Sequence, residues 1–322
     1  IALRPDSLII ADPAAGDIPE VISELDVEII EVPMKALARD ITAGRPNMVA
    51  LGLLCHWLGF CPDEAGRLID HIFHAKGLEI VKGSRKAFDA GFTEPLIVAA
   101  REARPGPERN KPAFDGQRWD LSGNEGCGLG ALRGGIRFAA ASPITPASDL
   151  LEWLAPRLDT LGGSLVQAED ELASINMVIG ASFGGVPAMT ATSGPGFALM
   201  LEAMGLAVAS ETPAVVVNVM RGGPSTGIPT KSEQADLNIA LHGLHGDAPH
   251  LVLGALDHAD CILTTEWSVR LAEALQTVAV LLTDQLLAQS RVLIPEPEYR
   301  LPDIPGRLTS GGEGNYQRYL DT

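Results

Sequence analysis

Three neighbouring carboxylates stand at the front of segment 166–182, VQAEDELASINMVIGAS. Asp170 and Glu171 suit the first turn of a helix, where acidic side chains interact favourably with the helix dipole. Helical spacing places Glu169 on a different stripe, with Leu172, Ala173, Asn176 and Gly180. If this stripe packs against other backbone, the carboxylate loses water and its proton affinity rises. Glu169 is therefore a candidate catalytic acid, although a buried acid satisfied by hydrogen bonds is the structural alternative.

Two further candidate residues lie where strands should end. Arg221 directly follows the apolar run PAVVVNVM and precedes a glycine pair, so we expect it at the carboxyl end of a strand, where open α/β sheets bind ligands. An arginine there suits a carboxylate or a phosphate, and a salt bridge to a neighbouring acid is the alternative. Thr145 lies between two prolines in SPITPAS, which place its hydroxyl on a rigid turn ahead of a helix; a simple strand-to-helix connection without a functional role is the alternative.

Two other motifs are weaker candidates. GCGLGA, residues 126–131, fits a loose dinucleotide fingerprint, but a poor strand precedes it. Ser122 or Asn124 followed by Glu125 instead predicts the start of a helix. In HGLHGDAPH, residues 242–250, the glycines break any helix that would hold histidines together as metal ligands. We expect a loop there and no metal site.

The elements around these motifs predict two α/β domains. The runs SLIIADP and VEIIEVP indicate strands, and three helices should follow. The second of these helices, NMVALGLLCHWLGF, is apolar on nearly all sides and should be buried. Farther along, the apolar strands PAMTATS, AVVVNVM and AVLLTD alternate with helices, which is typical of a doubly wound, mostly parallel sheet. We divide the chain into part of an α/β domain (1–105), a linker (106–118), a second α/β domain (119–295) and an extended tail (296–322).

Composition excludes some classes of partner. The chain has 322 residues, is 46% hydrophobic and carries a formal charge of -17, which argues against nucleic acid or an anionic membrane as a direct partner. No apolar run approaches the length of a membrane span. The four cysteines have no metal-binding spacing, so we expect free thiols in a reducing cytoplasm and no iron–sulfur cluster on this chain.

Taken together, four segments resemble the α subunit of the 2-oxoacid:ferredoxin (or flavodoxin) oxidoreductases. They are SGNEGCGLGALRGGIRFAAASPITPAS, VQAEDELASINMVIGAS, TATSGPGFALM and NVMRGGPSTGIPTKSEQADL, in this order, and the match runs from about residue 121 to 290. The front of the chain, with NMVALG and KAFDAGF, is similar to the γ domain that many of these enzymes fuse ahead of α. The resemblance implies that parts of the usual γ domain and a further C-terminal domain lie outside this sequence.

The resemblance also implies cofactors and partners. Such enzymes cleave a 2-oxoacid with thiamine diphosphate, pass electrons through Fe–S clusters to ferredoxin or flavodoxin, and transfer the acyl group to coenzyme A. The second domain would be the pyrimidine-binding half of the thiamine diphosphate site. A β subunit would carry the diphosphate half, its Mg²⁺ and a cluster, in a heterotetramer.

The family's motifs imply roles for three residues. Glu169 would be the acid that hydrogen-bonds the aminopyrimidine ring, so it is both the catalytic and the cofactor-binding residue. Thr145 and Arg221 would bind the substrate carboxylate. Ser142 stands where the family's signature has tyrosine, which leaves the size of the pocket open.

The substrate and the function class leave alternatives. The fused arrangement resembles the 2-oxoglutarate enzymes more than those for pyruvate or branched-chain 2-oxoacids. A second substrate carboxylate would need another cation, and the sequence does not choose among Arg133, Arg137 and Lys231. A non-catalytic scaffold subunit and another thiamine enzyme, such as a carboligase, are the alternatives of other kinds.

Overall fold

The computed structural model describes residue 3 and residues 7–25, 27–104, 116–297, 299 and 301–307. The chain forms two compact units, Ile1–Ala113 and Phe114–Thr322, hereafter unit 1 and unit 2. Most of the expected linker, residues 106–115, and the end of the expected tail, residues 308–322, lie outside the described residues. The expected domain boundaries therefore stay predictions.

Unit 1 combines a small parallel sheet with helices, as expected. Strands β1 (Leu8–Ala11) and β2 (Glu28–Glu31) pair in parallel. The helical elements are η1 (Pro13–Ala15), α1 (Glu20–Ser23), α2 (Met34–Arg39), α3 (Pro46–Leu58), α4 (Pro62–Phe73), η2 (His74–Lys76), α5 (Leu78–Phe92) and α6 (Pro95–Ala103). The expectation that α3 is buried on nearly all sides is wrong, because Leu51 and Leu54 are 36% and 49% exposed. They line an apolar groove against α4.

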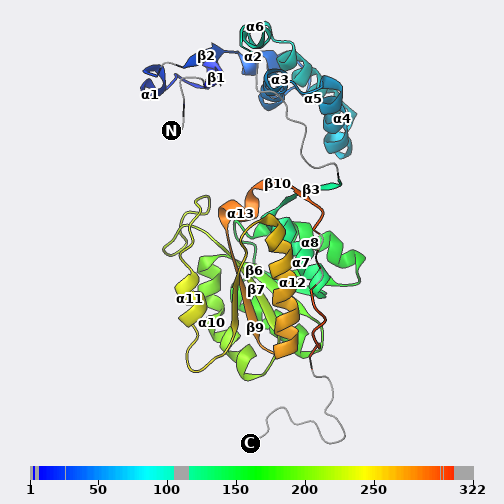
Figure 1. Cartoon of the computed structure of the whole chain (residues 1–322), viewed down its shortest axis with the longest axis vertical. Helices are drawn as coiled ribbons and strands as arrows, with labels where there is room; N and C mark the ends of the chain where they lie inside the picture. The colour runs from blue at the N-terminus through cyan, green and yellow to red at the C-terminus, as the bar shows by residue number, and fades with distance from the viewer. Residues whose placement is uncertain are drawn as a thin grey trace, which may run out of the picture. The chain divides into compact units, whose positions relative to one another are not determined.

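Unit 2 is built on a six-stranded, fully parallel sheet, which confirms the predicted fold class (Figure 1). The strands are β4 (Phe138–Ala141), β5 (Ser164–Gln167), β6 (Ala188–Thr192), β7 (Ala214–Met220), β8 (Leu251–Gly254) and β9 (Val278–Asp284). Their order across the sheet is β5-β4-β6-β7-β9-β8. A separate antiparallel pair joins β3 (Arg118–Ser122) to β10 (Arg291–Pro295).

Helices cover both faces of this sheet. On one face, α7 (Gly123–Gly134), α8 (Ser148–Thr160), α12 (His258–Leu275) and α13 (Gln285–Gln289) share a core with β4, β6, β7 and β9. On the other face lie α9 (Glu171–Phe183), α10 (Gly194–Ala209) and α11 (Leu237–His242). Strands buried on both faces read as continuous apolar runs, which is why β7 and β9 are apolar over most of their length.

The strand order reverses between β4 and β6. Because β4 connects through α8 on one face and β5 connects through α9 on the other, the carboxyl ends of β4 and β6 flank a topological switch point. Open α/β sheets bind their ligands in the crevice at such a point. A ligand site is therefore expected among the segments that follow β4, β5, β6 and β7.

Helix α7 shows that GCGLGA does not form a nucleotide-binding loop. Ser122 is its N-cap and forms a capping box with Glu125, as one of the two sequence alternatives predicted. The glycines of the motif lie inside the helix, where they allow close packing: a Cβ on Gly130 would lie 2.2 Å from the carbonyl oxygen of Ile262 in α12. Within the described residues, no helix is long and apolar enough to cross a membrane.

Candidate active site

Two of the residues singled out in the sequence meet at the carboxyl edge of the sheet. Arg221 follows β7 directly, and Thr145 lies on the connection from β4 to α8. Nη1 of Arg221 donates a hydrogen bond to the carbonyl oxygen of Thr145 at 2.6 Å, and Nη2 donates to the carbonyl of Thr226. Asn124 of α7 also holds this connection, since its Nδ2 donates to the carbonyl oxygen of Pro146 at 2.9 Å.

The guanidinium of Arg221 retains donors for a ligand. The residue is only 8% exposed, and its Nε is buried without a hydrogen-bond partner among the described residues. An arginine has five N–H donors, and a buried donor without an acceptor is costly. Within the described part of the chain, Arg221 forms no ion pair, so the alternative of a structural salt bridge is not supported. A bound carboxylate would supply both the missing acceptor and the opposite charge.

The expected placement of Glu169 is wrong in two respects. Helix α9 begins only at Glu171, because Asp170 adopts an extended conformation and caps the helix, accepting a hydrogen bond from the amide of Ala173 at 2.7 Å. Glu169 therefore lies in the bend between β5 and α9, outside the helical stripe with Leu172. Its side chain is exposed in this chain and not desolvated. The bend still lies at the carboxyl edge of the sheet, at its edge strand.

Glu171, which the sequence suggested as a capping residue, is the better buried acid of the three. It is half-buried, and its side chain lies against the first turn of α10. A Cβ built on Gly196 would lie 2.8 Å from Oε1 of Glu171 and 2.3 Å from Oγ1 of Thr192. Gly196 thus leaves the space that this carboxylate occupies beside the end of β6. The sequence signal for this was present, since glycine inside a helix often marks a close approach.

More buried polar atoms gather beside this carboxylate, around the end of β6 and the start of α10. Asn218 of β7 pairs in register with Thr192 of β6. Its Nδ2 donates to Asp236 at 2.9 Å, whereas its buried Oδ1 has no partner in the described residues. The same is true of Oγ of Ser193, the N-cap residue of α10. Sequence reasoning did not single out either residue, because burial of their side chains depends on the packing of both helix layers.

The segment between Arg221 and α11, residues 222–236, is fixed over the carboxyl ends of β7 and β9. Asp284, the last residue of β9, is 8% exposed and accepts hydrogen bonds from Oγ of Ser232 at 3.2 Å and from Nε2 of Gln234 at 2.5 Å. It also caps α13 by accepting from the amide of Leu287. Burial alone would raise the pKa of Asp284, but the hydrogen bonds that it accepts outweigh burial and lower the pKa below its ordinary value of 3.8.

The lowered pKa of Asp284 predicts a specific dependence of stability on pH. A carboxyl with a depressed folded-state pKa stabilises the fold fully above its unfolded pKa, and this contribution is lost as the pH falls through the folded-state pKa. Asp284→Asn should therefore melt below the wild type by a constant difference above about pH 5, and the difference should shrink below about pH 4. Thermal melts across this range, with the exposed Asp247→Asn as control, test this, and a difference independent of pH would contradict it.

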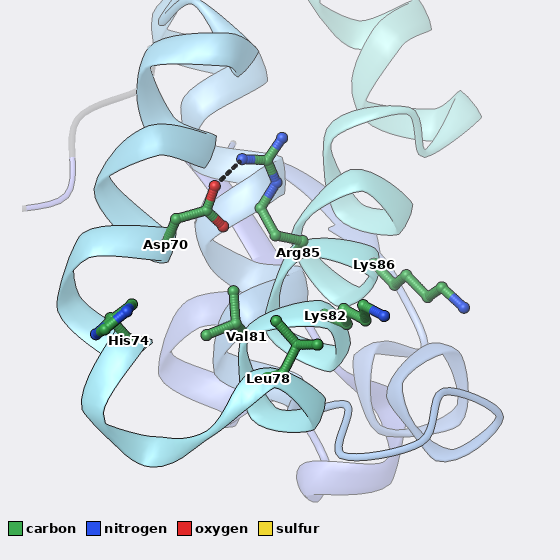
Figure 2. A pocket seen from close by; sticks show the side chains of 7 residues that line it. All are labelled: Asp70, His74, Leu78, Val81, Lys82, Arg85 and Lys86. Atoms are coloured by element: carbon green, nitrogen blue, oxygen red, sulfur yellow. Dashed lines mark hydrogen bonds and ion pairs between the residues drawn. The ribbon is translucent and has the colours of Figure 1, made fainter.

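The histidine segment 242–250 and the cysteines were the remaining candidates for a metal or cluster site. His250 contacts backbone carbonyls at 2.7 and 2.8 Å, and no cluster of metal ligands exists among the described residues. All four cysteines are free thiols, as expected. A hollow of ≈ 610 Å³ lies on unit 1, and Lys82 and Lys86 are among the residues that line it. Arg85 and Asp70, which also line it, form an ion pair at 3.0 Å (Figure 2). None of the expected site residues lies there.

Comparison with known proteins identifies the family. Residues 129–309 match the family described as "Pyruvate flavodoxin/ferredoxin oxidoreductase, thiamine diP-bdg", and residues 1–94 match "Pyruvate ferredoxin/flavodoxin oxidoreductase". This chain belongs to the 2-oxoacid:ferredoxin oxidoreductase family. The resemblance carried by the four sequence motifs is thereby confirmed. The match over residues 1–94 extends the family resemblance to the front of the chain, and its assignment to a γ domain stays a prediction.

Several relatives within the family support the same assignment. The chain is 33% identical, over 95% of its length, to the α subunit of 2-oxoacid:ferredoxin oxidoreductase 2 of Aeropyrum pernix, of which it covers 52%. It is 45% identical over 55% of its length to the 2-oxoglutarate synthase subunit KorA of Archaeoglobus fulgidus, of which the match covers 51%.

A solved member of the family has a closely similar fold. The 2-oxoglutarate:ferredoxin oxidoreductase of Magnetococcus marinus, solved with 2-oxoglutarate, coenzyme A and succinyl-CoA bound, is 42% identical with a TM-score of 0.85. That comparison covers 99% of this chain and 55% of the other chain. The chain thus spans about half the length of these relatives, and in one α subunit, that of Sulfurisphaera tokodaii, the match covers 35%.

Proposed function

We propose that this chain is the α component, with a fused γ part, of an enzyme that oxidatively decarboxylates a 2-oxoacid to an acyl-coenzyme A. The observation that carries the proposal is the placement of Thr145, Arg221 and Glu171 at the carboxyl edge of the sheet, where Arg221 contacts Thr145 and Glu171 lies beside the end of β6. The relatives named for 2-oxoglutarate favour that substrate over pyruvate or a branched-chain 2-oxoacid.

The residues around α10 fit the pyrimidine ring of thiamine diphosphate. An aminopyrimidine has both donors and acceptors at its edge, and it needs an acid to share a proton with a ring nitrogen. Glu171 offers a half-buried carboxylate, and the buried Oδ1 of Asn218 and Oγ of Ser193 are polar atoms without partners in the described residues. Thiamine diphosphate, when bound, supplies the nucleophilic carbon and the electron sink that decarboxylation of a 2-oxoacid requires.

In this proposal, the acid at the start of α9 holds the proton at the pyrimidine ring. The family motif assigns that role to Glu169, whereas burial and contact with the first turn of α10 favour Glu171. The contact with the first turn of α10 holds the half-buried carboxylate of Glu171 in position, whereas the side chain of Glu169 is exposed. We therefore assign the role to Glu171 and keep Glu169 as the alternative.

Arg221 and Thr145 bind and orient the carboxylate next to the keto group. The guanidinium offers its unpartnered Nε–H together with a neighbouring N–H, so it can hold the two carboxylate oxygens in parallel. The hydrogen bond from Arg221 to the Thr145 carbonyl keeps the threonine hydroxyl, which is exposed, beside this position. Fixing the carboxylate in this way orients the keto carbon toward the cofactor.

The proposal requires other subunits and small molecules. A β subunit would contribute the diphosphate half of the site, Mg²⁺ and an Fe–S cluster, and the two subunits would assemble as a heterotetramer. Ferredoxin or flavodoxin would accept the electrons, and coenzyme A would accept the acyl group.

Reconstitution with the β subunit tests the proposed function. The complex of the full-length protein with that subunit and thiamine diphosphate should reduce ferredoxin in the presence of coenzyme A and 2-oxoglutarate. The full-length protein alone should not, because half of the cofactor's contacts are missing. Turnover by the isolated protein, or a complex that consumes no 2-oxoacid, would contradict the proposal, and the second result would favour a scaffold subunit.

A further inference from the structure

We propose that Lys231 binds the distal carboxylate of the substrate, so that the site selects dicarboxylic 2-oxoacids. The inference rests on the proposed function, and it names the substrate class and a residue that determines it. A 2-oxoacid with a second carboxylate brings two negative charges into the site. Arg221 can bind only the one next to the keto group, so a second cation is needed at the same edge of the sheet.

The two arginines that competed with Lys231 in the sequence lie at the opposite edge. In a parallel sheet with antiparallel helices, the end of α7 and the start of β4 share the amino edge. Arg133 stands near the end of α7 and forms an ion pair with the buried Glu266 at 3.0 Å. Arg137 directly precedes β4 and donates to the carbonyl oxygen of Ile136 at 2.7 Å. Neither can reach a ligand that Arg221 holds.

Four other described arginines of unit 2 are also unsuited to bind the distal carboxylate, because they lie toward the amino edge of the sheet or form ion pairs. Arg270 forms an ion pair with Glu266 at 2.6 Å, and Arg307 with Glu273 at 2.6 Å, both on the half of α12 that ends at the amino edge. Arg157 lies near the end of α8, at the same edge, and stacks on Trp153. Arg291 of β10 is paired with Asp120 and Glu125.

Lys231, in contrast, lies on the segment that follows β7 at the carboxyl edge of the sheet, close to the backbone next to Arg221. Its carbonyl oxygen accepts a hydrogen bond from the amide of Gly222, the residue after Arg221, at 2.8 Å. A Cβ on Gly222 would lie 3.5 Å from Cβ of Lys231. The side chain is exposed and, within the described part of the chain, forms no ion pair. Lys231 is also the only lysine in the sequence after residue 113.

The backbone that carries Lys231 is fixed, although its ammonium group is not. Asp284 binds the side chain of Ser232, the next residue, and Glu233 accepts a hydrogen bond from the amide of Gly223 at 2.9 Å. A flexible stem on a fixed backbone lets the ammonium meet the far end of a substrate. Because the exposed side chain of Lys231 offers a charge, a substrate with an uncharged tail would gain nothing from it.

Substrate comparison in the assembled complex tests the role of Lys231. We compare 2-oxoglutarate with 2-oxopentanoate, which has the same chain length without the distal carboxylate. Loss of a hydrogen bond to a charged group costs roughly one to two orders of magnitude in binding. Lys231→Ala should therefore lower kcat/KM for 2-oxoglutarate by about 10- to 100-fold, mainly through KM, and leave 2-oxopentanoate unchanged. Lys231→Arg should restore much of the loss, and Lys82→Ala in unit 1 is the matched control.

The outcomes separate this inference from the proposed function. If neither 2-oxoacid is turned over by the wild-type complex, the proposed function fails. If turnover occurs but Lys231→Ala affects both substrates equally, or raises only the KM for coenzyme A, the inference alone is overturned. A second readout needs no turnover: 2-oxoglutarate should protect Lys231 from acetylation, measured by mass spectrometry, whereas 2-oxopentanoate should not. Equal protection by both acids would also overturn it.

Discussion

Glu171→Gln is expected to abolish most of the turnover of a 2-oxoacid by the assembled complex, because glutamine cannot share a proton with the cofactor. The loss should fall within the range of about 10²- to 10⁴-fold that a positioned acid or base contributes. Glutamine keeps the size of the side chain and its contact with the first turn of α10, so the fold should be preserved. Steady-state kcat at saturating 2-oxoglutarate, together with a thermal melt, measures both properties.

Glu169→Gln provides the matched control for this prediction. Glu169 is exposed and lies before the helix, so its replacement should change turnover by much less than the replacement of Glu171. A large loss of turnover in Glu169→Gln together with a small loss in Glu171→Gln would contradict our assignment. It would instead support Glu169, the acid that the family motif suggested. Small losses of turnover at both positions would show that neither glutamate is the acid that shares a proton with the cofactor.

Arg221→Lys is expected to lower kcat/KM for every 2-oxoacid by at least about 10²-fold, because lysine cannot bind a carboxylate with two parallel N–H donors. The same change removes the hydrogen bonds to the carbonyls of Thr145 and Thr226, so the connection after β4 should also lose its position. Because all 2-oxoacids share the carboxylate next to the keto group, pyruvate, 2-oxopentanoate and 2-oxoglutarate should be affected alike.

Measuring kcat/KM for these three acids distinguishes Arg221 from Lys231. A uniform loss supports a role at the shared carboxylate, whereas a loss confined to 2-oxoglutarate would move Arg221 to the distal end. Thr145→Ala should give a smaller but equally uniform loss, because it removes the hydroxyl and leaves the carbonyl that Arg221 contacts.

Much of the fold was predictable from local patterns in the sequence. The continuous apolar runs of β7 and β9 predicted a parallel sheet covered on both faces, and Ser122 with Glu125 predicted the start of α7. The placement of Arg221 after β7 followed from the same pattern, because the end of an apolar strand is visible in the sequence. Its contact with Thr145, 76 positions away, depends on the order of the strands and was not predictable.

The start of α9 was the main error, and its cause is local. Three successive acids can each begin a helix, and spacing alone does not choose between them. Asp170 caps α9 with its side chain, which leaves Glu169 in the bend and turns Glu171 toward α10. Gly196, on another helix, provides the space for Glu171, so only the packed structure identifies the more buried acid.

The choice among the three cations also needed the tertiary structure. The sequence does not choose among Arg133, Arg137 and Lys231, but the sheet separates them into two edges. Arg133 forms an ion pair with the buried Glu266 and lies over the ring of Tyr299, and burial raises the pKa of Tyr299 to about 12. Contacts between residues so far apart in the chain cannot be predicted from the pattern of a single sequence.

The most direct test is a structure of the full complex with thiamine diphosphate bound. A carboxylate oxygen of Glu171 should lie about 2.6–3.2 Å from a ring nitrogen of the pyrimidine, with the ring at the carboxyl ends of β4 and β6. Arg221 should face the open side of the same crevice. A cofactor bound elsewhere, or a pyrimidine whose only acid neighbour comes from another position or another subunit, would contradict this account.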